Sequence, residues 1–314
     1  MHKRFVNHCT IELTIQPDGP ILIKSGKEGA DPTKPDMEFV ETYHAGGRSI
    51  YLPGSSLKGA IRAHAERVVR TIGNDKYDVK NPNKIWANDP LNDKYDYLKD
   101  KSSAADIYKL SSFTDKIFGN TSISSRIRID DAYPSKTKPL RVEERNGVAI
   151  DRVFGSVAVG PFNYQVCTDG EFHTKIHLKN FTLAQLGLIG LVLRDLNDGW
   201  FGLGFAKSRG LGTVIVNYKK AIVQYPGCEL KDGQIHSLKG DKSWSNTILL
   251  GAGEFVDDAD SYGFVKPDRQ DNIPVAATEM ALGFGVELIW SEGTVTDLFE
   301  RAVKSWKNLL LATK

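Results

Sequence analysis

Residues 172–218 decide the fold, and they read FHTKIHLKNFTLAQLGLIGLVLRDLNDGWFGLGFAKSRGLGTVIVNY. Apolar and polar residues alternate over residues 172–178, which predicts a half-buried strand. Thr182 and Gln185 then have the spacing of a capping box ahead of an apolar helix at residues 186–196. A glycine-rich loop follows, and a second strand is predicted over residues 213–218. The stretch therefore predicts strand, helix, loop and strand in that order.

The first half of the chain contains elements of the same kind. Strict alternation over residues 10–15 predicts a strand, and residues 126–130 alternate in the same way. A helix is predicted from about residue 57 to 71, with Leu57, Ile61, Val68 and Val69 facing inward. The whole order is strand, helix, strand, hairpin, strand, helix, strand. This order is typical of an α+β, RRM-like (ferredoxin-like) core with large insertions.

The chain divides into a core over residues 1–223 and an extension over residues 224–314. Residues 73–125 are expected to be an insertion, and the part up to residue 106, rich in Asn, Asp, Lys and Tyr, is expected to lie over the surface. A polar, basic segment punctuated by proline and glycine, at about residues 134–162, predicts a protruding β-hairpin. The extension is expected to hold an acidic loop, a strand and an amphipathic helix.

Composition limits the class of protein. Hydrophobic residues make up 40% of the chain and charged residues 25%, as in soluble globular proteins. We find no apolar run long enough to span a membrane and no apolar signal-peptide core in the first residues. The three cysteines are far apart and have no paired spacing, so a reducing, cytoplasmic setting is expected, without a disulfide framework or a zinc cluster. A net charge of +2 by itself neither indicates nor excludes a nucleic-acid partner.

The glycine-rich loop is the most informative stretch for function. Glycines at 202, 204, 210 and 212 flank Lys207, Ser208 and Arg209. Glycines permit sharp turns with exposed amides, and the two cations add positive charge, so the loop suits a phosphate. It matches neither a P-loop nor a dinucleotide-binding fingerprint. A purely structural turn is the alternative.

A second turn, at residues 53–59, precedes the first helix. Ser55 or Ser56 is expected to cap this helix, whose open amides attract anions. Lys58 lies in the first turn, where a cation is unfavourable unless it faces a negative group, and Arg62 lies one turn later. Plain capping with two solvated charges is the alternative.

Several ordered motifs together resemble a known family. They are YLPGSSLKGAIR at residues 51–62, Phe118-Gly119, SRIRIDDA at residues 125–132, RVEERNGVAIDR at residues 141–152 and the loop at residues 202–212. In this order they are similar to the RAMP superfamily of CRISPR systems, and most of all to the backbone subunits of type III effector complexes. The resemblance spans about residues 8–218.

The resemblance implies a fold and an activity. Such subunits have an RRM-like core, assemble along a guide RNA with other effector subunits, and insert a β-hairpin thumb into the guide–target duplex. Carried over to this chain, the resemblance implies that Arg126 and residues 141–152 lie on or near the thumb. The residues implied to bind RNA are Ser55, Ser56, Lys58, Arg62, Arg126, Lys207, Ser208 and Arg209.

In family members that cleave, an aspartate in the loop after the first strand cuts the target RNA with a divalent cation, Mg or Mn. Asp36 lies nearest the family position, and Asp31 is the second candidate. No other metal ligand is assigned. Two solvated loop acids are the alternative, in which case the protein is a non-catalytic structural subunit that binds guide RNA.

Another alternative is a metal-independent endoribonuclease that processes the guide precursor. His44 and His64 flank the second turn and are the acid–base candidates for such an activity. In such enzymes the glycine-rich loop lies near the C-terminus, whereas about a third of this chain follows it. A small-molecule enzyme is disfavoured, because no cofactor motif is present.

Overall fold

The computed structural model of this chain describes residues 4–26, 35–44, 47–80, 84–91, 96–99, 103–257 and 262–312. Its centre is an antiparallel sheet that contains β1 (His8–Pro17), β4 (Ile127–Ile129), β8 (Phe172–Lys179) and β9 (Val214–Tyr225) in the spatial order β9-β1-β8-β4. Helix α1 (Gly54–Ile72) connects β1 to β4, and α4 (Leu183–Asn197) connects β8 to β9. This is the order of the ferredoxin-like core predicted from the sequence.

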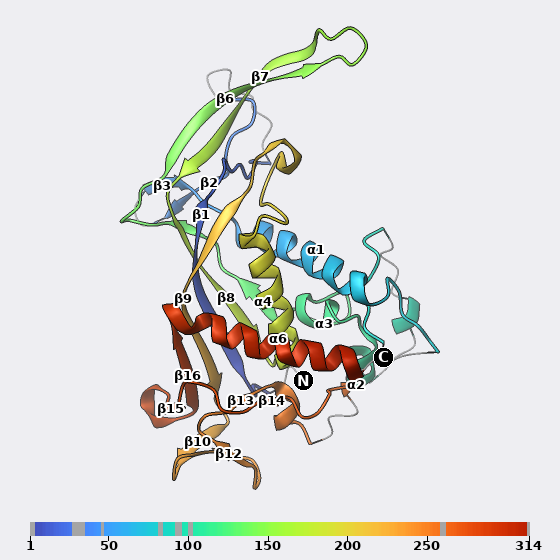
Figure 1. Ribbon diagram of the computed structural model, residues 1–314, viewed down its shortest axis with the longest axis vertical. Coiled ribbons are helices and arrows are strands. Elements are labelled where there is room, and N and C mark those ends of the chain that lie inside the picture. Colours follow the sequence, from blue (N-terminus) through green and yellow to red (C-terminus); the bar gives the residue numbers. More distant parts are fainter. Residues whose placement is uncertain are drawn as a thin grey trace.

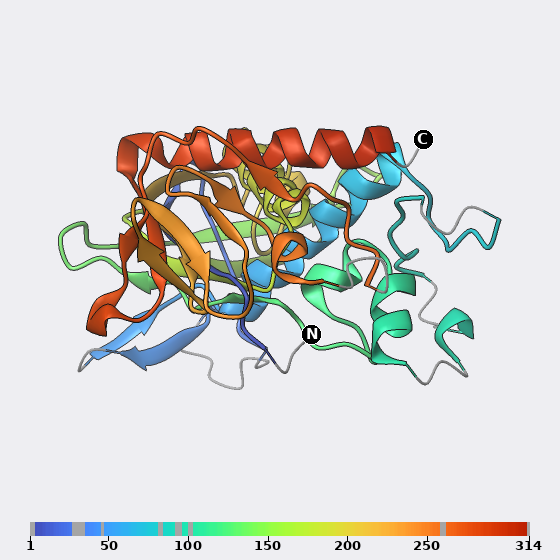
Figure 2. The same ribbon diagram turned by 90° about the horizontal axis from the view of Figure 1, so that it is seen from below.

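Strand register explains the buried core. Ile11 in β1 lies opposite Ile176 in β8 and Ala221 in β9, and all three are fully or almost fully buried. Along β8, buried residues alternate with exposed or half-buried ones, as the sequence predicts. Helices α1 and α4 cover one face of the sheet together with α6 (Val295–Ala312) (Figures 1 and 2).

The capping box predicted for α4 is present. The Thr182 hydroxyl accepts a hydrogen bond from the Gln185 amide, and the Gln185 side chain accepts one from the Thr182 amide. The helix begins three residues before the predicted start, because Leu183 and Ala184 are already buried and helical.

The C-terminal extension continues the same core. Strand β16 (Val286–Ser291) pairs with β9, and β15 (Thr278–Glu279) pairs with β16. Trp290 and Leu298 are fully buried in the cluster that contains the first strand. The 223/224 boundary therefore falls within β9, and the extension adds to the sheet and its helical layer. The remaining strands of the extension form small sheets and are β10 (Cys228–Lys231), β11 (Gln234–Ser237), β12 (Ser243–Ser245), β13 (Leu249–Leu250) and β14 (Arg269–Gln270).

The predicted hairpin is formed by β6 (Arg141–Ile150) and β7 (Val157–Asp169), which pair only with each other among the named strands. It projects away from the sheet and forms one end of the molecule (Figure 1). A shorter hairpin, β2 (Glu41–His44) with β3 (Gly47–Ile50), lies near its root, and β5 (Tyr133–Pro134) pairs with β8.

The insertion is more deeply packed than predicted. It holds a 3-10 turn (Asp96–Leu98), α2 (Ala104–Leu110) and α3 (Asp115–Phe118). The expectation that residues 73–106 lie only over the surface is wrong, because Ile85, Trp86 and Ala87 are buried. These apolar residues are isolated in a polar segment, so no periodicity reveals them.

Two further expectations from the sequence concern the cysteines and membrane-spanning helices. Cys9, Cys167 and Cys228 are all buried and free. In the described parts of the chain, no helix combines the length and the apolar character that crossing a membrane requires.

Candidate nucleic-acid interface

The chain segment after β1 connects two parts of the candidate site. The Phe205 amide of the glycine-rich loop (residues 199–212, hereafter the Gly loop) donates a hydrogen bond to the Leu22 carbonyl at 2.7 Å. The neighbouring Ile23 carbonyl accepts one from the Val40 amide at 2.9 Å. The Gly loop and the segment at residues 36–40 therefore lie on either side of residues 20–24, at one end of the sheet.

Glycine is required at two positions of the Gly loop. Gly204 has φ +79°, and a Cβ there would collide with the Leu22 carbonyl. Gly212 has φ +93°, and a Cβ there would collide with the Leu203 carbonyl. Both positions combine left-handed backbone with close backbone approach, which only glycine tolerates. The glycine spacing thus shapes a rigid loop against residues 20–24.

The cations of the Gly loop lie at its outer surface. Lys207, Ser208 and Arg209 form a single 3-10 turn, and all three are exposed. The Arg209 guanidinium lies 5.0 Å from the centroid of the Phe205 ring, close enough for a cation–π contact. Among the described residues, neither Lys207 nor Arg209 forms an ion pair, so both charges are available to an external anion.

Helix α1 begins differently from the prediction. Pro53 is its N-cap, and neither Ser55 nor Ser56 caps it. The Gly54 amide instead donates to the Asp131 carboxylate at 2.7 Å, which places a negative charge at the positive end of the helix. The capping expectation is therefore wrong, and the Ser55 and Ser56 side chains remain exposed.

Most cations near this helix are paired within the protein. Arg62 donates to Glu66 at 2.8 Å and to the fully buried Asp115 at 2.9 Å. Arg48 pairs with Glu41 at 2.7 Å. The charges of Arg48 and Arg62 are thus compensated within the protein, and Arg62 has a structural role.

Lys58 is half-buried and donates to the Ser125 hydroxyl at 2.8 Å. Burial, followed by the neighbouring Arg62, lowers the pKa of its ammonium below the usual range. A neutral hydroxyl leaves the Lys58 charge uncompensated, so an external phosphate remains a suitable partner.

Arg126 does not lie on the hairpin. Its side chain is 3% exposed, it donates to the Asn180 carbonyl at 2.6 Å, and its guanidinium lies 4.0 Å from the Tyr108 ring centroid. The expectation that Arg126 lies on or near the thumb is therefore wrong. Buried contacts with the insertion, which leave no sequence pattern, hold it in the interior.

Asp36 lies beside the middle of the β6–β7 hairpin. One oxygen of its exposed carboxylate accepts a hydrogen bond from the Asn163 amide of β7 at 2.9 Å. The next residue, Met37, donates to the Asn163 carbonyl at 3.1 Å. Asp31 lies outside the described residues. Within the described ranges, no three His, Cys, Asp or Glu side chains are grouped as a metal-binding cluster.

The two candidate histidines have different surroundings. His64 is buried, lies 2.7 Å from the Asp195 carboxylate and stacks on Phe201 at 4.3 Å between ring centroids. These contacts fix α1 against the start of the Gly loop and exclude His64 from solvent. His44 is exposed, and its ring stacks on the Tyr133 ring with 3.7 Å between the ring centroids.

The tip of the hairpin carries exposed residues that sequence reasoning did not single out. Val153 and Phe154 are 82% and 83% exposed and lie beside the exposed Arg152. The Asp151 carboxylate accepts hydrogen bonds from both of their amides, at 2.7 and 2.8 Å, which orders the turn. The sequence could have revealed this tip, because two large apolar residues stand at the turn of an otherwise polar hairpin.

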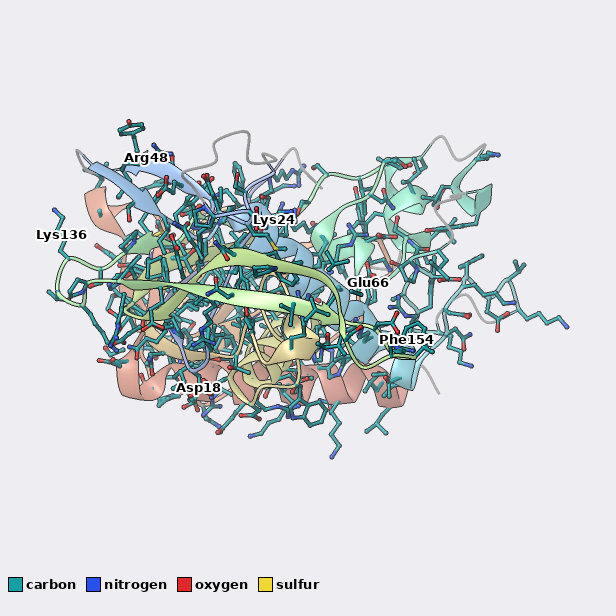
Figure 3. All side chains as sticks on the ribbon, turned by 90° about the horizontal axis from the view of Figure 1, so that it is seen from above. Asp18, Lys24, Arg48, Glu66, Lys136 and Phe154 are labelled. Atoms are coloured by element: carbon teal, nitrogen blue, oxygen red, sulfur yellow. The ribbon has the colours of Figure 1, made fainter. Side chains whose placement is uncertain are left out.

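Figure 3 shows the molecule along its long axis. The hairpin crosses above the sheet and ends near Phe154, and Asp18 and Lys24 label the segment that follows β1.

Comparison with known protein families gives a match. The family model of the RAMP superfamily matches residues 14–215, more than half of the chain. The matched range contains the whole β6–β7 hairpin, α1, α4 and the Gly loop. No curated protein matches the sequence. From the family match and the ferredoxin-like core, we conclude that the chain belongs to the RAMP superfamily of CRISPR proteins.

Proposed function

We propose that this RAMP protein is a subunit of an RNA-guided type III CRISPR effector complex. In this proposal it binds the sugar–phosphate backbone of the guide RNA and contributes a carboxylate to cleavage of the paired target RNA. One observation carries the proposal. The Gly loop, the segment with Asp36 and the β6–β7 hairpin meet at one end of the sheet, through hydrogen bonds to residues 20–24 and to Asn163.

The chemistry of this surface suits RNA that is bound without regard to sequence. A guide carries a different sequence in each complex, so its contacts must go to phosphates and 2′-hydroxyls. Exposed Lys207 and Arg209, which form no ion pair with the residues that the structure describes, supply positive charge. The Ser208, Ser55 and Ser56 hydroxyls supply neutral hydrogen-bonding groups. The exposed apolar tip of the hairpin suits contact with a base pair that it unstacks.

Asp36 is the proposed cleavage residue, with Asp31 as the second candidate. One Asp36 oxygen is engaged by the Asn163 amide, which orients the carboxylate and leaves its other oxygen toward solvent. Mg²⁺ is commonly held by one or two carboxylates together with substrate phosphates, so this single carboxylate fits such an ion. The ion would neutralise charge on the scissile phosphate.

Cleavage by the assembled complex tests the catalytic part. We expect Asp36→Ala to slow target cleavage next to this subunit by about 10²- to 10⁴-fold while guide binding is retained. Asp31→Ala is measured in parallel. Asp18→Ala, another exposed loop carboxylate at the same end of the sheet, is the control and should cleave normally. Unchanged cleavage in both the Asp36 and Asp31 variants would remove the catalytic claim.

A second candidate function is a purely structural, guide-binding subunit. It is favoured by the hydrogen bond that the Asn163 amide donates to Asp36, because this contact alone is a reason for an aspartate beside the hairpin. The guide-binding part is tested by sequencing the RNA that copurifies with the protein. Uniform short RNAs with a repeat-derived 5′ tag are expected, and random cellular RNA would contradict it.

A further inference from the structure

A cavity of about 610 Å³ lies at the opposite end of α4 from the Gly loop. Its walls come from the insertion, the first turn of α4, residues 263–270 and the end of α6. Figure 2 shows these segments gathered near the C-terminal end of α6. These are mostly the parts of the chain that the RAMP motifs do not explain. The volume is in the range of sites for small organic ligands.

The described wall of this cavity is strongly cationic. One carboxylate, Asp268, lies in the described lining, and it is already engaged by the backbone. It accepts hydrogen bonds from the Leu183 amide and from the Gly253 amide, both at 2.9 Å. Both oxygens of Asp268 therefore serve backbone amides at the start of α4 and at Gly253. The cations of the lining are Lys84, Lys109, Lys116, Lys266 and Arg269.

Lys116 is the cation that most needs a partner. No described carboxylate lies within ion-pair distance of it, and its ammonium lies 5.6 Å from the Tyr108 ring centroid. Burial, followed by the neighbouring Arg126 and Lys109, lowers the pKa of Lys116 to about 8. A cation placed among other cations is costly, and an anionic ligand would offset that cost.

Aromatic residues supply the second recognition element. Trp86, Tyr108, Phe113 and Phe264 all contribute to the lining, on the same cavity as the cations. A bare phosphate ion would fill only a small part of this volume. A phosphate carried on an aromatic base uses both the charge and the apolar surface.

We propose that this cavity binds a nucleoside phosphate, with the phosphate group at Lys116 and the base among the aromatic side chains. The nucleotide is either free in solution or the terminal nucleotide of an RNA strand, since both present the same chemistry. This site is separate from the proposed guide-binding surface and does not depend on it.

Titration calorimetry of the full chain with AMP tests the proposal. Lys116→Met keeps most of the side-chain volume and removes the charge, so we expect AMP affinity to fall about 10- to 100-fold. The thermal midpoint of this variant should stay equal or rise, because no ion pair is lost. Lys231→Met, at an exposed position on β10, is the control and should bind AMP like the unmodified chain. Equal AMP affinity in the Lys116 variant would overturn the proposal.

Two further titrations identify the kind of ligand. Inorganic phosphate alone should bind more weakly than AMP, and equal affinity would overturn the role of the base. A short RNA with a terminal phosphate is added to displace AMP. Displacement by this RNA, and not by the same RNA ending in a hydroxyl, assigns the site to an RNA terminus. Failure of the RNA to displace AMP assigns the site to a free nucleotide, and absence of AMP binding contradicts the site altogether.

Discussion

The Asp268 carboxylate is buried between the start of α4 and the turn at Gly253. Burial raises its pKa to about 7, while the amides of Gly253 and Leu183 act in the opposite direction. A carboxyl whose folded pKa lies above its ordinary value of 3.8 stabilises the fold below pH 4. This contribution is lost as the pH rises through about 7.

We therefore expect the free energy of unfolding to fall more steeply between pH 4 and pH 7 in the unmodified chain than in Asp268→Asn. The variant should also be about 1–3 kcal/mol less stable near pH 7, since one backbone amide loses its acceptor. Urea denaturation of both proteins across this pH range measures the difference. Parallel pH profiles would show that folding does not raise the pKa of Asp268.

A substitution of Arg62 tests whether this side chain binds RNA phosphate or stabilises the fold. The motif implied a phosphate contact, whereas the structure pairs Arg62 with the fully buried Asp115 and with Glu66. We expect Arg62→Met to lower the free energy of unfolding by about 2–4 kcal/mol, because Asp115 loses its cationic partner. Denaturant melts measure this loss. RNA affinity of the folded variant should be unchanged, and a selective loss of RNA binding would restore the original interpretation.

At the scale of elements, the contact between α4 and α6 depends on small residues. A Cβ at Gly187 would collide with the Ala302 carbonyl of α6, and backbone cannot move aside as a side chain can. We expect Gly187→Ala to cost about 1–3 kcal/mol of stability, despite the better helix propensity of alanine. Thermal denaturation measures this loss of stability. Gly59→Ala, on an open face of α1, is the control and should stabilise by about 0.5–1 kcal/mol.

A substitution at the hairpin tip should affect target binding without affecting the stability of the fold. Phe154 is 83% exposed, so Phe154→Ser should leave the thermal midpoint of the protein unchanged. If the hairpin unstacks the guide–target duplex, the same change should weaken target binding by the assembled complex several-fold. Gel-shift titration with target RNA measures the affinity of the complex for its target. Normal target binding by the variant would argue against that role of the tip.

Local patterns predicted most of the elements, and nonlocal contacts account for what they missed. Alternation placed the strands around Ile11 and Ile176, and the capping box placed α4, because these signals lie within a few residues of each other. The pairing of β16 with β9 depends on residues about 65 positions apart in sequence, which no local pattern encodes. Arg126 was misassigned for the same reason, since its partner Tyr108 lies in the insertion.

At the scale of the whole molecule, charge is distributed unevenly. The chain carries a net charge of only +2, and many of its cations are paired within the protein. Helix α4 runs between two groups of cations, those of the Gly loop after its C-terminus and those that line the cavity at its first turn. The net charge of the chain is therefore a poor guide to its partners, and the positions of these two groups of cations are more informative.

The central claim is that the Gly loop binds RNA phosphates through Lys207 and Arg209. The most direct test is the salt dependence of single-stranded RNA binding by the full chain. Replacing both residues with alanine should weaken binding at low salt and reduce the slope of log affinity against log salt by about 1.4, since each phosphate contact on a single strand contributes about 0.7. The matched control replaces Lys231 and Lys239, two exposed cations of the C-terminal extension, and should leave the slope unchanged. An unchanged slope in the Gly-loop variant, or an equal decrease in the control, would contradict the account.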